Sequence, residues 1–112
     1  MAMYGFAVPV QAGTMAAWRG YVAEMAGPRG ADYAESRRRA GVTTERVWLQ
    51  QTPQGDMAVV YLEAADVGKV FEAFLTSQHP FDQWFRDNVL VGVHGMNPSG
   101  PPPPMNEPIF GV

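Results

Sequence analysis

Residues 43–65 read TTERVWLQQTPQGDMAVVYLEAA, and this stretch decides the fold. Two runs rich in β-branched and aromatic residues flank a turn signal at Thr52–Asp56. Within that signal, Pro53 fixes φ at the first corner and Gly55 can adopt a positive φ at the exit. The pattern predicts one β-hairpin at the centre of a single sheet.

The length of the turn determines which residues face one another. We expect a three-residue loop. It predicts these cross-strand pairs: Gln51 with Met57, Leu49 with Val59 and Val47 with Tyr61 on one face, and Gln50 with Ala58, Trp48 with Val60 and Arg46 with Leu62 on the other. Because both faces are then largely apolar, the sheet should be covered on each side. We assign the Leu49/Val59 face to the chain's own helices and the Trp48 face to another layer.

Periodicity predicts the elements around the hairpin. Met3–Val10 alternates with period two, as a strand does. Apolar residues recur at helical spacing in Met15–Ala26 and after Asp66, a predicted N-cap. A further helix is expected over Ala31–Ala40, and a last one begins at Pro80. Residues 89–94 fit either a helix or a short strand, and we favour a helix to about Val93.

Composition bounds the class of protein. The chain has 112 residues, 46% of them hydrophobic, which suffices for one domain with a core. A formal net charge of −3 argues against nucleic-acid binding, and the absence of cysteine excludes disulfides and thiolate metal sites. No signal peptide and no apolar run of about 20 residues is evident. We therefore expect a soluble cytoplasmic protein with no cofactor, no metal and no membrane contact.

The last residues differ in composition from the rest. We expect a domain over residues 1–96 and a proline-rich tail over 97–112, with four consecutive prolines at 101–104. Such a segment favours an extended polyproline II spacer. Because Ile109 and Phe110 follow as an apolar end, we predict docking on the partner subunit, although the sequence leaves docking in cis or in trans open.

The predicted order of elements, strand, helix, two strands, helix and a possible late strand, is the split βαββα(β) of a ferredoxin-like α+β fold. With Tyr4–Val10, the Val42–Ala64 hairpin and the Phe71–Phe85 helices, the chain resembles the dimeric α/β-barrel superfamily, which includes antibiotic-biosynthesis monooxygenase-like and stress-responsive barrel proteins. The passage ESRRRAGVTTERVWLQ resembles a small bacterial family with a proline-rich end. The resemblance implies an antiparallel sheet with helices on one face and a sheet-to-sheet homodimer on the other.

Aromatic side chains supply the candidate sites. A candidate pocket between sheet and helices comprises Trp18, Tyr33, Tyr61, Phe74, His79 and Trp84, although the same rings would also suit a core. The candidate dimer interface comprises Trp48, Val60, Leu62, Ile109 and Phe110. We interpret residues 37–39, three arginines, as a solvated helix end. In the predicted register Glu45 and Glu63 lie opposite one another and are exposed.

Two functions remain open on the sequence. The first is a non-catalytic dimeric module for association or for binding a small apolar or aromatic molecule. The alternative is a cofactor-independent monooxygenase or isomerase acting on such a molecule. No acid, base or nucleophile constellation is recognisable, so catalytic residues stay unassigned and the first function is favoured.

Overall fold

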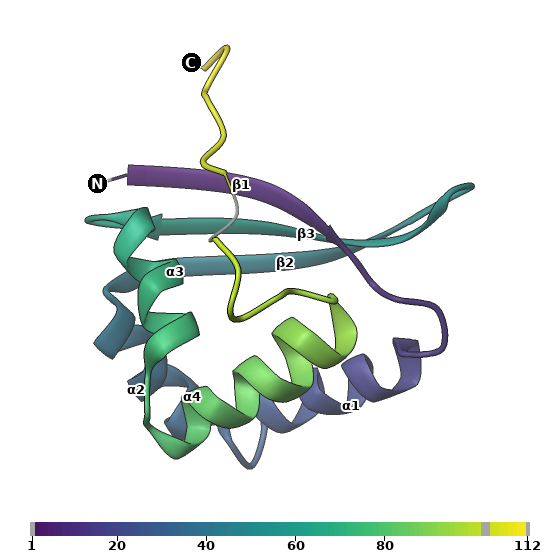
Figure 1. Cartoon of the computed structure of the whole chain (residues 1–112), viewed down its shortest axis with the longest axis horizontal. Helices are drawn as coiled ribbons and strands as arrows, with labels where there is room; N and C mark the ends of the chain where they lie inside the picture. The colour runs from purple at the N-terminus through teal and green to yellow at the C-terminus, as the bar shows by residue number, and fades with distance from the viewer. Residues whose placement is uncertain (1, 102–103, 112) are drawn as a thin grey trace.

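The computed structural model describes residues 2–101 and 104–111. The fold is α+β, with a three-stranded antiparallel sheet and helices packed along one of its faces (Figure 1). The elements, in chain order, are β1 (Ala2–Pro9), α1 (Met15–Ala26), α2 (Gly30–Ala40), β2 (Val42–Thr52), β3 (Gly55–Ala64), α3 (Val67–Thr76), α4 (Pro80–Phe85) and the π-helical segment η1 (Arg86–Val93).

The strands lie in the order β1-β3-β2, so β3 is central and β2 is an edge. The predicted hairpin is confirmed, but only its second strand occupies the centre of the sheet. β1 pairs antiparallel with β3 and ends at Pro9. A proline lacks a backbone N–H, which suits this position at the end of an edge strand.

The hairpin loop is shorter than predicted. Thr52 pairs with Gly55, so Pro53 and Gln54 alone form the loop. The Thr52 hydroxyl closes this turn, because it donates to the carbonyl oxygen of Gly55 at 2.6 Å and its oxygen accepts from the Gln54 N–H at 3.2 Å. The predicted register is therefore wrong by one residue. Since side chains alternate along a strand, the shift exchanges the two faces of β3 relative to β2.

This shift corrects the predicted interface. Val60 and Leu62 face the helices, where they are only 9% and 1% exposed, and Leu49 faces the same way. Trp48 lies on the opposite face beside Val59 and is 54% exposed. Val60 and Leu62 are thus core residues of the subunit, whereas Trp48 belongs to the uncovered face. The assignment of Val59 to the helix-covered face was also wrong.

The helices agree closely with the predicted ranges, because local signals set their ends. Gly41 adopts the left-handed conformation (φ 81°) that ends α2, and the Asp66 carboxylate accepts from the Lys69 N–H at 3.3 Å to cap α3. Residues 86–93 are helical, as favoured, and in π form: the His94 N–H donates to the Val89 carbonyl five residues earlier at 3.1 Å. None of the described helices has the length and apolar content needed to span a membrane.

The core fills the space between the sheet and the helices. Aromatic rings from β1 and α3 meet there edge to face, with Tyr4 and Phe71 centroids 5.6 Å apart. The buried apolar residues of the described chain are Tyr4, Val10, Trp18, Ala58, Val60, Leu62, Ala64, Val67, Val70, Phe71, Phe74, Phe81, Phe85, Val89, Leu90 and Val93. The other face of the sheet carries no helix in the described part (Figure 1).

The corrected register predicts how two strand positions respond to truncation. Leu62→Ala should lower the free energy of unfolding by about 3 kcal/mol, because it opens a cavity in the core. Val47→Ala, on the same face but 48% exposed, should cost under about 1 kcal/mol. Urea denaturation monitored by circular dichroism measures both. Equal losses in the two variants would contradict the burial assigned to Leu62.

Candidate functional site

A cavity of about 270 Å³ lies between the helix-covered face of the sheet and the surrounding helices. Most of its wall is apolar. The apolar lining residues are Phe6, Val8, Val47, Val60 and Leu62 from the strands, Val22, Met25 and Ala26 from α1, and Phe74, Phe85, Val89, Leu90 and Met96 from the second half of the chain. Four further lining residues bring hydrogen-bonding groups: Tyr33, Arg37, Glu45 and His94. A mostly apolar wall with a few polar groups is the usual composition of a small-molecule site.

Arg37 and Glu45 form a buried ion pair at the cavity wall. The Arg37 Nε donates to Glu45 Oε1 at 2.8 Å, and the two side chains are 7% and 11% exposed. The guanidinium carbon also lies 4.3–4.6 Å from the ring centroids of Tyr33, Phe74 and Phe85. Such contacts between a cation and aromatic faces stabilise a charge that has lost its water.

The local sequence explains why these two charges meet. Gly41 ends α2 and β2 begins at Val42, so eight residues suffice to bring Arg37 against Glu45. Glu45 pairs with Leu62 in the sheet and therefore faces the helices. The prediction that Glu45 is exposed opposite Glu63 is wrong, because Glu63 pairs with Thr44 and points to the other face. The prediction of three solvated arginines is also wrong for Arg37, which is 5% exposed.

Tyr33 completes this polar side of the cavity. Its hydroxyl donates to the same carboxylate oxygen of Glu45 that Arg37 binds. Burial, and then the negative charge of Glu45, raise the pKa of Tyr33 far above its ordinary value. Tyr33 is therefore a neutral hydrogen-bond donor at physiological pH, and a phenolate base is ruled out at this position.

His94 supplies the remaining polar group of the lining. Its Nδ1 lies 2.8 Å from the carbonyl oxygen of Pro9. A carbonyl oxygen can only accept, so Nδ1 carries the proton and Nε2 presents a lone pair. Burial lowers the pKa of His94, although the hydrogen bond to Pro9 opposes this shift. The edge of the imidazole meets Trp18, with centroids 6.0 Å apart. His94 is thus a neutral side chain in the cavity lining, with Nε2 as its acceptor nitrogen.

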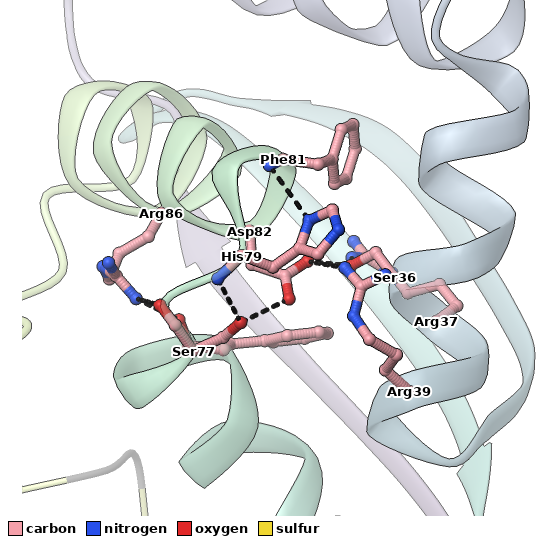
Figure 2. A network of polar contacts seen from close by, with 9 residues as sticks. Ser36, Arg37, Arg39, Ser77, His79, Phe81, Asp82 and Arg86 are labelled. Atoms are coloured by element: carbon pink, nitrogen blue, oxygen red, sulfur yellow. Dashed lines mark hydrogen bonds and ion pairs between the residues drawn. The ribbon is translucent and has the colours of Figure 1, made fainter.

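A second polar cluster, centred on Asp82, joins α2 to the turn between α3 and α4 (Figure 2). Asp82 Oδ1 accepts from the Ser36 hydroxyl and from Arg39 Nη2 at 3.0 Å, and Oδ2 accepts from the Ser77 hydroxyl at 2.6 Å. Burial alone would raise the pKa of Asp82, but these hydrogen bonds and the Arg39 charge together lower it. The carboxylate therefore stays ionised inside the fold.

The two clusters are continuous. Arg37 Nη1 donates to the Ser36 hydroxyl oxygen at 3.2 Å, and the same hydroxyl donates to Asp82. Figure 2 shows Ser36 and Arg39 reaching toward the Asp82 carboxylate, while Arg86 binds the α3 terminus from the other side. Asp82 thus helps to hold α2, and with it Arg37, at the wall of the cavity.

The six predicted pocket residues are distributed over the molecule. Tyr33 and Phe74 line the cavity, and Trp18 lines a groove next to it. The other three lie elsewhere. Tyr61 lies on the uncovered face, His79 is an exposed N-cap whose Nδ1 accepts from the Phe81 N–H at 3.3 Å, and Trp84 packs against Tyr21, Phe81 and Arg29.

Sequence reasoning missed Arg37, Glu45 and His94. One signal was present: Tyr33 and Arg37 are four residues apart in a predicted helix, so they share a face. Glu45 also shares a face of β2 with Leu49, which was assigned to the helices, and a two-residue hairpin loop would have placed Leu62 opposite it in place of Glu63. His94 had no comparable signal, because its place depends on the π-helical segment before it.

No protein-family model matches the chain, and no curated protein matches it at a significant level. In residues 2–101 and 104–111, no group of three or more His, Cys, Asp or Glu side chains has the geometry to hold a metal ion.

The Asp82 cluster predicts a pH-dependent contribution to stability. Asp82→Asn should lower the free energy of unfolding at pH 7 by about 2 kcal/mol, because charge-assisted hydrogen bonds are lost. The pKa of Asp82 is lower in the folded than in the unfolded state, so this contribution is complete above the unfolded value of about 3.9 and disappears as pH falls through the folded value. The difference between wild type and variant should therefore shrink in acid.

Asp87→Asn is the matched control, since the Asp87 side chain is 73% exposed and should change stability by under about 0.5 kcal/mol at any pH. Denaturant titrations from pH 7 to pH 2.5 test both variants. A constant gap between wild type and Asp82→Asn across that range would contradict the assigned charge state.

Proposed function

We propose that the protein is a homodimeric, non-catalytic module that binds a small apolar or aromatic molecule in the cavity between its sheet and its helices. The observation that carries this proposal is the cavity itself, whose apolar wall is interrupted by four residues with hydrogen-bonding groups. Its volume of about 270 Å³ is just below the range of about 300–1,000 Å³ typical of ligand sites. The expected ligand is therefore small.

The polar groups favour binding over catalysis. Glu45 is engaged by both Arg37 and Tyr33, which leaves it poorly placed to take a proton from a ligand. The Tyr33 hydroxyl stays protonated for the reason given above. These groups fit the role of orienting a ligand, with Arg37 or Tyr33 at one part of the wall and the acceptor nitrogen of His94 at another.

The alternative, a cofactor-independent monooxygenase or isomerase, has one specific observation in its favour. A neutral imidazole with an available Nε2 in apolar surroundings is a candidate general base. His94 nevertheless has only the Pro9 carbonyl as its hydrogen-bond partner among the described residues, so no carboxylate is present to stabilise its protonated form. Turnover that depends on His94 would favour this alternative.

The fold supports the proposed relation to dimeric α/β-barrel proteins. In a split β-α-β arrangement the second hairpin strand lies beside the first strand of the chain, as β3 lies beside β1 here. The described helices cover one face of the sheet and leave the other without a helix (Figure 1). In dimers of that superfamily the two uncovered faces pack together.

The uncovered face has the composition of an interface. Met3 and Trp48 are 67% and 54% exposed there, and Val59 and Tyr61 lie between them on the central strand. Thr44, Arg46 and Glu63 share this face, so the apolar side chains form a patch among polar ones, and such a patch is costly to leave in water. A two-fold arrangement would bury the patch of each subunit against the same patch of the other.

The proposed ligand site predicts binding of 1-naphthol, an apolar two-ring molecule with one hydroxyl. Saturation-transfer difference NMR should detect binding to the wild type. Ala26→Trp should weaken it by about tenfold or more, because Ala26 lines the cavity and the new ring would occupy it. Ala17→Trp, an exposed position of α1 outside the lining, is the control and should bind normally. Equal affinity in the two variants would refute this site.

The proposed dimer predicts a mass of two chains in size-exclusion chromatography with light scattering at micromolar concentration. Trp48→Glu should shift it to monomer, since an unpaired charge in a buried interface costs several kcal/mol. Ala17→Glu, on the exposed side of α1, should remain dimeric. A monomeric wild type, or a dimer indifferent to Trp48→Glu, would exclude packing through this face.

A further inference from the structure

A groove runs between α1 and the outer edge of the sheet. It has a volume of about 310 Å³, and its lining comes from Trp18, Arg19, Val22, Ala23 and Ala26 of α1 and from Val47 and Leu49 of β2. Val22, Ala26 and Val47 also line the cavity described above, so the groove leads into it. Although they lie on the helix-covered side, Val22 and Val47 are 42% and 48% exposed. The cavity therefore opens between α1 and β2.

The strand beside this groove, β2, is an edge strand of the sheet. β2 pairs with β3 on one side and, in the described part of the chain, has no neighbour on the other. An edge strand next to an apolar groove is the arrangement that receives an added extended segment: backbone groups bind along the edge, and alternate side chains enter the groove.

The tail is an extended segment with apolar side chains. The Tyr4 hydroxyl donates to the Pro104 carbonyl at 2.8 Å and fixes the tail at the outer edge of β1. From there the chain continues past β1 and away from the rest of its own subunit (Figure 1). Ile109 and Phe110 are 86% and 87% exposed. The apolar end of the tail is thus not buried in its own subunit and is open to contact a second copy.

We infer that residues 109–111 of one subunit dock in the α1–β2 groove of the second copy. This inference depends on the proposed dimer and specifies its tail contact. From its anchor at Pro104 to Ile109 the tail spans about 15 Å at about 3.1 Å per residue in polyproline II form, and packed sheets lie about 10 Å apart. The tail can therefore pass the partner's sheet and reach its helix-covered side.

The charges of the groove and of the tail also favour docking of the tail in the groove. Arg19 is the one charged residue in the described lining of the groove. Glu107 is the one charged residue of the tail. Docking would bring opposite charges together at the groove while Ile109 and Phe110 cover Val22 and Val47. The docked tail would then close the mouth of the cavity, so that ligand entry requires its release.

The chain contains no cysteine, so engineered cysteines report contacts without background. Phe110→Cys and Val22→Cys proteins are mixed in equal amounts, one of them carrying an affinity tag, and are oxidised mildly. We expect Phe110→Cys to form a disulfide-linked heterodimer with Val22→Cys in several-fold higher yield than with either of two controls. The controls are Ala17→Cys, on the exposed side of α1, and Arg46→Cys, on the uncovered sheet face. Melting temperatures confirm that each variant is folded.

Each contrary result has its own meaning. Preferential coupling to Arg46→Cys would place the tail on the sheet face and overturn the groove contact. A double variant, Phe110→Cys with Val22→Cys, that closes within one chain at high dilution would show docking in cis and overturn the exchange. A dimeric mass without selective coupling would refute the tail contact alone, whereas a monomeric mass would refute the proposed dimer as well.

Discussion

The guanidinium of Arg37 is buried where α2, β2, α3 and α4 meet. It binds Glu45 through Nε, contacts the Ser36 hydroxyl through Nη1 and lies against three aromatic rings. A buried charge without its partner costs about 3–5 kcal/mol, so these elements must keep their relative positions for the fold to remain stable. The cavity is next to this charge, and its polar side is therefore among the more rigid parts of the molecule.

Much of the fold could be predicted from local sequence signals. The ranges of α1 and α3, the cap at Asp66 and the end of α2 at Gly41 depend on residues within one or two turns of each other. The hairpin was also predictable, but its register was not. The alternation of side chains predicts the two faces of each strand. A change of one residue in the loop, however, decides which residues of the two strands pair and therefore which faces lie on the same side of the sheet.

The site was harder to predict because its contacts join distant parts of the chain. Asp82 is 46 residues from Ser36 and 43 from Arg39, and no local pattern indicates either pair. A run of three arginines gives no sign that Arg37 is buried and that Arg38, 76% exposed, is not. Aromatic residues were a better guide to the core than to the cavity, since both environments use the same rings.

The π-helical segment before His94 makes the length of the chain itself a determinant of the site. An α-helix turns about 100° per residue, so if residues 86–93 adopted α-helical hydrogen bonds without losing a residue, everything after them would be rotated by about that angle. The imidazole would then leave both the Pro9 carbonyl and the cavity. In evolutionary terms, a related chain that is one residue shorter here could form a regular α-helix and keep its histidine at the cavity, because the His94 N–H bond to Val89 would then span four residues in place of five.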